Sequence, residues 1–125
     1  MKKLTTLFFY VLAAVSFISC MHNNHNTNIA YSEYSHYYTM NAHFPRSQTR
    51  HVDEFMDDRI GRASKMSFVN SRIDGVITLD DRTKFYIRKS PGVLEIKFDK
   101  DENTEEAYHT IKSMCQEIKK VLTHQ

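Results

Sequence analysis

Three oxygen-bearing side chains stand at alternate positions late in the chain and could begin a calcium-binding loop. Asp99, Asp101 and Asn103 match the first three ligand positions of such a loop, in which alternate side-chain oxygens surround a hard cation. The pattern then fails, because Thr104 stands where the sharp turn needs glycine and Thr110 stands where a glutamate should close the site. We therefore interpret the segment as a polar turn that leads into a helix, and we expect no metal ion or cofactor there.

Other residues capable of chemistry also have a structural interpretation. Cys115 lies in the middle of an apolar helical stripe, without the neighbouring base or cation that a nucleophilic thiolate needs, so we expect it to be a packing residue. Four acids in residues 53–58 could be mistaken for a catalytic pair, but we expect all of them to face solvent. The chain has no phosphate-binding glycine loop and no nucleophile elbow. These observations favour a protein that is not an enzyme.

Histidines gather near the start of the chain, at His22, His25, His36 and His43. Imidazoles bind transition metals when three or four ligands are held on ordered backbone. An asparagine-rich segment offers no such geometry, so we expect solvated side chains and no metal site.

Two groups of residues could instead bind a partner. Tyr34 and Tyr37 belong to a cluster of four tyrosines in residues 31–38, and tyrosine combines apolar area with a polar tip, which suits protein or sugar surfaces. A strand that enters the core would use some of the same residues, and that structural interpretation stays open. The second group lies on one face of a predicted sheet, where it could also be an ordinary solvated surface. It consists of Lys84, Tyr86, Arg88 and Lys97.

The elements that must position these residues follow from hydrophobic periodicity. Alternation predicts a first strand over residues 37–44, and three- and four-residue spacing predicts a helix over residues 47–63. Residues 66–98 are typical of a hairpin series. We expect strands at 68–73, 76–80, 83–89 and 93–98, with a two-residue turn at Asp74-Gly75 and another turn at 90–92.

A long amphipathic helix ends the chain. It is expected to begin at Asn103 or Thr104, with Glu106 completing a capping box. Its apolar stripe must pack on the sheet or on a partner. We predict an α+β domain over residues 36–125, with an antiparallel sheet of four to five strands and two helices on one face.

The first twenty residues differ from the rest. Lys2 and Lys3 precede an apolar run over residues 7–18, which is shorter than the roughly 20 residues of a membrane span. This arrangement is typical of an export signal. Residues 17–20, Phe-Ile-Ser-Cys, resemble the cleavage box of bacterial lipoproteins, although leucine is commoner at the first position. The resemblance implies a signal peptide over residues 1–19 and a lipid anchor on Cys20.

The resemblance also implies a location. Met21 stands where an aspartate would retain a lipoprotein in the inner membrane, so we expect the outer membrane, on its periplasmic face. Residues 20–35 are rich in Asn, His and Ser, and we predict that they form a flexible tether.

The net charge of the chain limits the classes of partner that we expect. Residues 1–19 hold two of the seventeen basic residues and none of the fifteen acidic ones, so residues 20–125 are formally neutral, which argues against nucleic acid. Cys20 and Cys115 are the two cysteines of the chain, so a disulfide framework is excluded if Cys20 is acylated. The sequence favours a non-catalytic envelope lipoprotein that binds a protein, as an accessory subunit or an immunity-type inhibitor. A small-ligand or glycan binder is the alternative.

Overall fold

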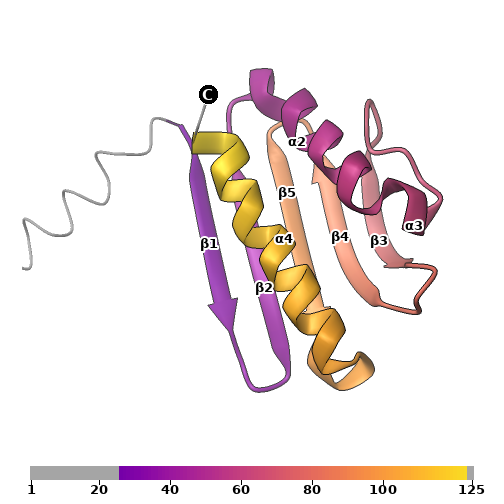
Figure 1. Ribbon diagram of the computed structural model, residues 1–125. Helices are drawn as coiled ribbons and strands as arrows, with labels where there is room; N and C mark the ends of the chain where they lie inside the picture. Colours follow the sequence, from indigo (N-terminus) through magenta and orange to yellow (C-terminus); the bar gives the residue numbers. More distant parts are fainter. Residues whose placement is uncertain (1–25, 124–125) are drawn as a thin grey trace, which may run out of the picture.

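The computed structural model describes residues 26–123, so the predicted signal peptide, Cys20 and Met21 lie outside it. Figure 1 shows the arrangement. The strands are β1 (Asn28–Glu33), β2 (Tyr37–His43), β3 (Ile73–Thr78), β4 (Lys84–Ser90) and β5 (Val93–Asp99). The helices are α2 (Thr49–Met56), α3 (Arg62–Ser64) and α4 (Glu105–Thr123), with 3-10 turns at Arg46–Gln48 and Lys100–Glu102 and a π-helical turn at Asp57–Gly61.

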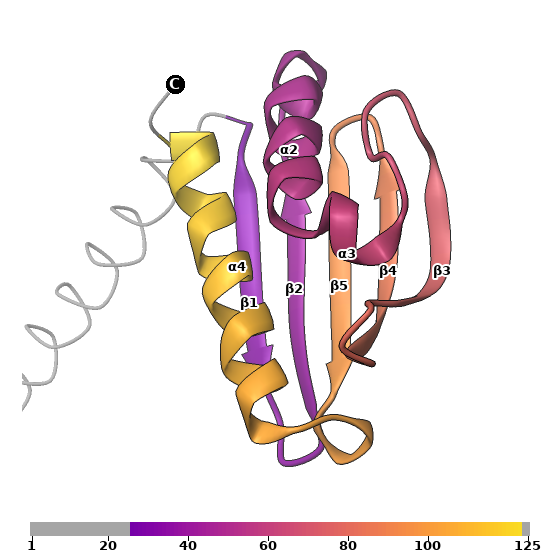
Figure 2. The ribbon, with the colours of Figure 1, turned by 45° about the vertical axis from the view of Figure 1, so that its right-hand side comes forward.

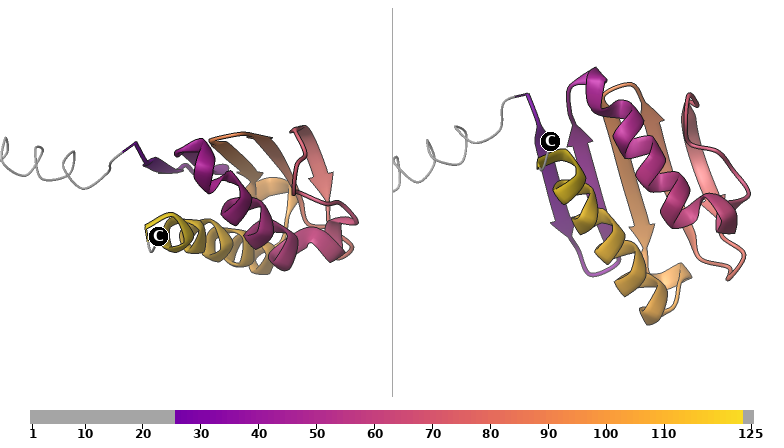
Figure 3. Two further views of the ribbon diagram at one scale, coloured as in Figure 1. Left: turned by 90° about the horizontal axis from the view of Figure 1, so that it is seen from above. Right: turned by 45° about the horizontal axis from the view of Figure 1, so that its top comes forward.

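The five strands form one antiparallel sheet in the order β1-β2-β5-β4-β3. Helices α2 and α4 run side by side across one face of this sheet, and no helix within residues 26–123 lies on the other face (Figures 2 and 3). The predicted α+β class, with an antiparallel sheet under two helices, is confirmed. No helix among residues 26–123 is long and apolar enough to cross a membrane.

Alternation along the strands places the core between the sheet and the helices. The apolar side chains that alternate along the predicted strands of residues 76–98 are all buried: Ile77, Leu79, Phe85, Ile87, Leu94, Ile96 and Phe98. Helix α4 contributes Ile111, Met114, Cys115, Ile118 and Leu122 to the same core. Each large apolar side chain contributes about 1.5–3 kcal/mol when it is fully buried, so this layer is the main source of stability.

The first predicted helix is present, but it is not a regular α-helix. Val52, Met56 and Ile60 are buried as the spacing predicts, and the π-helical turn lies between α2 and α3. The side chain of Gln48, which precedes α2, makes no capping hydrogen bond, and the Thr49 hydroxyl accepts one from the Gly92 amide at 2.9 Å. The segment ends at Lys65, which adopts a left-handed conformation with φ 57°.

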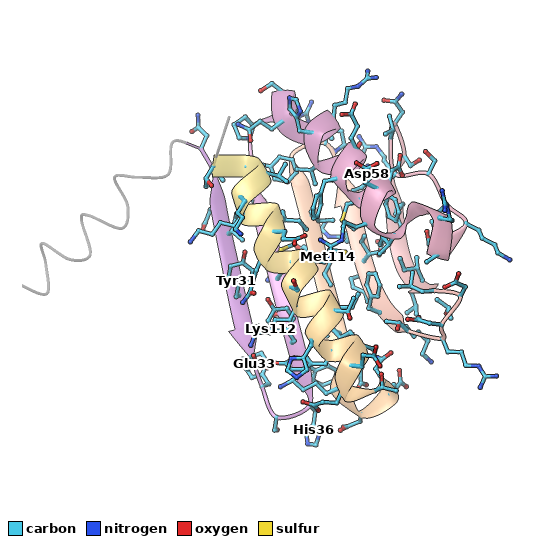
Figure 4. All side chains as sticks on the ribbon, viewed as in Figure 1. Tyr31, Glu33, His36, Asp58, Lys112 and Met114 are labelled. Carbon is cyan, nitrogen blue, oxygen red and sulfur yellow. The ribbon has the colours of Figure 1, made fainter. Side chains whose placement is uncertain are left out.

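The predicted tether over residues 20–35 requires correction, because part of it is strand β1. β1 pairs with β2 over its whole length, from the pair Asn28–His43 to the pair Glu33–Tyr38. Polar contacts hold it against α4. The Tyr31 hydroxyl donates to the Cys115 carbonyl at 3.1 Å, and Lys112 Nζ lies 2.8 Å from a Glu33 carboxylate oxygen (Figure 4).

The expected hairpin turn at Asp74-Gly75 is also wrong. Both residues lie inside β3, where Gly75 pairs with Ile87, and Gly75 does not have positive φ. The expected strand over residues 68–73 is a loop up to Arg72. Its fully buried Phe68 is held by a hydrogen bond of 2.6 Å from the Phe68 amide to the Asp57 carboxylate.

The start of α4 departs from the expected capping box. The Thr104 hydroxyl accepts from the Ala107 amide at 3.0 Å, which makes Thr104 the cap. Asn103 instead binds the backbone of β4, accepting from the Lys84 amide and donating to the Lys84 carbonyl, each at 2.9 Å. This side chain fixes the helix to the sheet.

Candidate functional site: an uncovered sheet face and a basic cleft

The sheet face that none of the described helices covers, here called the uncovered face, carries a groove of about 370 Å³. The groove brings together residues from the two groups that the sequence analysis proposed separately. It is lined by Tyr34, Tyr37, Tyr86 and Lys97, together with Ser32, Thr39, Asn41, Glu95 and Ile96. Antiparallel register explains the meeting, because Tyr86 pairs with Lys97 and Lys97 in turn pairs with Thr39. Tyr34 reaches the groove from the β1–β2 connection and Tyr37 from the first position of β2, with 60% and 38% of their surface exposed.

The tyrosine cluster divides between the two sides of the sheet. Tyr38 is buried and stacks with Tyr31, with ring centroids 6.5 Å apart. Burial raises the pKa of both phenols. The structural interpretation therefore holds for the core residue Tyr38. Tyr31 is 37% exposed and is engaged by its hydrogen bond to α4, whereas Tyr34 and Tyr37 lie on the groove side of the sheet.

Charges on the uncovered face are mostly paired. Arg88 makes a two-pronged contact with Glu95 at 2.8 and 2.7 Å, which raises the pKa of Arg88 and lowers that of Glu95. Lys97 Nζ lies 4.4 Å from the centre of the Tyr37 ring. This face is therefore a mixed surface, and it is not a basic patch.

Two members of the proposed group do not line the groove. Lys84 lies 3.5 Å from the Glu102 carboxylate at the end of the sheet, and Arg88 is held beside the groove by Glu95. Tyr86 is positioned by its hydroxyl, which donates to Asp74 at 2.6 Å and so has a raised pKa. The candidate site therefore consists of three tyrosines and Lys97, with polar side chains between them.

A second site, which the sequence analysis missed, lies between the start of α2, the loop before β3 and the β4–β5 turn. It is a cleft of about 400 Å³ lined by Arg46, Ser47, Thr49, Arg50, Asp53, Asn70, Ser71, Arg72, Lys89 and Pro91. Lys89 and Asp53 lie at its base as an ion pair, with 2% and 4% of their side-chain surface exposed and 3.0 Å between Nζ and Oδ1. The expectation that all four acids of residues 53–58 face solvent is wrong for Asp53.

Burial dominates the electrostatics of this pair. Loss of solvation raises the pKa of Asp53, although Lys89 and the Asn70 amide both act to lower it. Asp53 Oδ1 contacts the ammonium without receiving an aligned hydrogen bond. The attraction therefore offsets the cost of burying the carboxylate only in part.

A sequence signal for the pair exists. Lys89 continues the alternation of Phe85 and Ile87, and Asp53 lies between Val52 and Met56 on the apolar stripe of α2. Opposite charges at core positions of two different elements indicate a buried ion pair.

The remaining candidates have structural roles. Asp99 accepts from the Asp101 amide at 2.9 Å, and Asp101 contacts His36 at 2.7 Å, so both side chains serve the turn before α4. No group of three or more His, Cys, Asp or Glu side chains within the described part of the chain is placed to hold a metal ion. Burial raises the pKa of the Cys115 thiol to about 12.

Comparison with known proteins identifies no relatives. No family model, no curated protein and no solved structure matches the chain.

Proposed function

We propose that this protein is a lipid-anchored, non-catalytic lipoprotein of the bacterial envelope that works by binding another protein through the groove on its uncovered sheet face. It would serve as an accessory subunit of an envelope assembly or as an immunity-type inhibitor. The anchor is Cys20, and the expected location is the periplasmic face of the outer membrane.

One observation carries the binding proposal. Three partly exposed tyrosines and Lys97 gather in one groove, on the face that the protein's own helices leave open. Interface cores are enriched in aromatic residues, which bury large areas at low cost in conformational entropy. The neighbouring pairs Arg88–Glu95 and Tyr86–Asp74 hold the surrounding side chains in place before a partner arrives.

The anchor is compatible with this use of the sheet face. Asn26, the first described residue, lies six positions after Cys20, and a chain of that length spans at most about 20 Å. A domain on so short a connection stays near the membrane, where envelope partners are found.

Site-specific photocrosslinking tests the proposal in cells. A photoreactive amino acid at Asn41, which is exposed in the groove, should capture one discrete protein, whereas the same probe at Ser113, exposed on α4, should not. Capture should disappear in Tyr37→Ala/Tyr86→Ala and persist in the control Met66→Ala, which removes an exposed apolar side chain from a loop. Equal capture from both probe positions, or capture that survives the double substitution, contradicts the proposal.

A glycan or another small ligand is the second candidate. The groove volume lies within the range of ligand pockets, and Ser32, Thr39 and Asn41 offer hydrogen bonds beside aromatic rings. Thermal-shift screening with soluble oligosaccharides tests it. A rise in melting temperature that is lost in Tyr37→Ala/Tyr86→Ala would favour the glycan over a protein.

A further inference from the structure

The two ends of the sheet differ sharply in charge. We call the end at which β1, β3 and β5 begin the proximal end, and the opposite end the distal end. The distal segments 33–36, 79–84 and 99–106 contain eight carboxylates and three Lys or Arg residues. The proximal segments 43–50, 70–73, 89–93 and 119–123 contain six Lys or Arg residues and no carboxylate, and the nearby acids Asp53 and Glu54 of α2 pair with two of these cations, Lys89 and Arg50.

The chain enters the domain at the basic end. Asn28 begins β1 and pairs with His43, which ends β2 directly before the cleft segment. Figure 1 shows the start of β1, the start of α2 and the end of α4 at this end of the sheet. An anchor on Cys20 therefore holds the proximal end nearest to the membrane.

The cleft described above opens at the proximal end and has unpaired arginines. Neither Arg46 nor Arg72 forms an ion pair with any residue in the range 26–123, and both are exposed. Arg50 forms an ion pair with Glu54, with 2.9 Å between Nε and Oε1. The carboxylate of Asp53 is already neutralised by Lys89, so the net charge available to a ligand is positive.

We infer that this cleft binds the phosphate of an anionic phospholipid headgroup. Arginine presents a planar fork of donors that fits phosphate oxygens, and three arginines here surround a cavity of about 400 Å³. Anionic membrane surfaces attract basic segments by about 1 kcal/mol per Lys or Arg. The contact holds the proximal end against the bilayer, turns the acidic distal end away from it, and leaves the uncovered sheet face open to a partner. The inference rests on the proposed membrane anchorage.

A lipid titration followed by NMR tests the cleft directly. The purified full chain, in micelles of an uncharged detergent, is titrated with short-chain phosphatidylglycerol, with short-chain phosphatidylcholine and with inorganic phosphate. Phosphatidylglycerol should give saturable shifts of the backbone amides in residues 46–50 and 70–72, and the other two probes should bind about tenfold more weakly or not at all.

Matched variants assign the binding to the arginines. Arg46→Gln/Arg72→Gln should weaken phosphatidylglycerol binding by about tenfold. Arg62→Gln/Lys65→Gln removes the same charge from exposed positions outside the cleft and should change binding by less than about twofold. Thermal melts of both double variants should match that of the wild type, because all four side chains are exposed.

Three results would overturn the inference. Absence of saturable shifts means that the cleft is not a lipid site. Equal binding by the two double variants means that the attraction is not specific to the cleft. Inorganic phosphate that saturates the same amides as tightly as phosphatidylglycerol makes the ligand a free anion. The titration depends neither on acylation nor on the groove of the uncovered sheet face. A failed titration therefore leaves the proposed partner binding in place, and a failed photocrosslinking experiment leaves the lipid site in place.

Discussion

Lys89 and Asp53 form an ion pair that is almost completely withdrawn from water, with 3.0 Å between Nζ and Oδ1. The pair joins the end of β4 to the second turn of α2, and it forms the base of the basic cleft. Burying two charges is costly, and breaking such a pair leaves an uncompensated charge in the interior.

Removing one partner should therefore be far worse than removing both. Asp53→Ala is expected to reduce the free energy of unfolding by about 3–5 kcal/mol, because the Lys89 ammonium loses its partner. Asp53→Leu/Lys89→Met should recover most of this loss, because the surrounding core is apolar. Urea unfolding of both variants measures the difference. A double variant no more stable than Asp53→Ala would contradict a buried, desolvated pair.

Strand β1 should loosen in acid through Glu33. Its carboxylate accepts hydrogen bonds from Lys100, Lys112 and Tyr108, which lower its pKa from 4.5 to about 2. The stabilising contribution is therefore complete above pH 4.5 and is lost as the pH falls towards 2. Amide exchange within β1, measured across this window, should accelerate more than exchange within β5.

Glu33→Gln provides the comparison for this pH effect. The variant should exchange faster in β1 at neutral pH and lose most of the acid dependence, because no carboxyl remains to be protonated. Glu106→Gln, an exposed change outside the Glu33 cluster, should leave the wild-type profile intact. A wild-type pH profile in Glu33→Gln would show that other groups control the strand.

Gly75 in β3 and Gly92 in the β4–β5 turn should respond to alanine in opposite directions. A Cβ on Gly75 meets nothing within 4 Å, and its φ is not positive, so Gly75→Ala should stabilise the protein by about 0.4–1 kcal/mol. Gly92 has φ +78°, and a Cβ there would lie 2.8 Å from the Phe44 carbonyl oxygen, so Gly92→Ala should cost about 1–3 kcal/mol. Chemical denaturation measures both. A destabilising Gly75→Ala would instead support a tight turn at Asp74-Gly75.

Cys115 should behave as a packing residue. Cys115→Ser places a hydroxyl in the core and should lower the free energy of unfolding by about 1–3 kcal/mol, reduced in part if the serine bonds the Ile111 carbonyl. The wild-type thiol should react with a thiol reagent only as fast as the domain opens. A variant of unchanged stability that had lost an activity would point to a reactive thiol.

Sequence patterns predicted the parts of the fold that depend on apolar periodicity. The inward apolar side chains of β4 and β5 follow such patterns and are buried, and so is most of the α4 stripe, in which Leu122 is buried and Val121 is half-buried. β1 lacks that signal, because it is an edge strand with little aliphatic content that is held by side-chain contacts such as Tyr31 to Cys115 and Glu33 to Lys112. Those partners lie about eighty residues away, so local sequence does not reveal them.

The candidate sites, like the fold, could be predicted from local sequence patterns only in part. Alternation predicts that Tyr86 and Lys97 lie on one face of the sheet. Tyr34 and Tyr37 line the same groove because of the strand order, which alternation does not give. The charge of Asp53 predicts a solvent-facing side chain, so local sequence does not indicate the cleft, although Asp53 follows the buried Val52 on α2.

Membrane anchorage through Cys20 is the claim on which both proposals depend, and labelled-palmitate incorporation in cells tests it most directly. Label is expected on the wild-type chain and on Cys115→Ser, with none on Cys20→Ser, which should accumulate as an uncleaved precursor or a mislocalised soluble form. Label that persists on Cys20→Ser, or a wild-type chain that takes up none, would contradict a lipid anchor on Cys20.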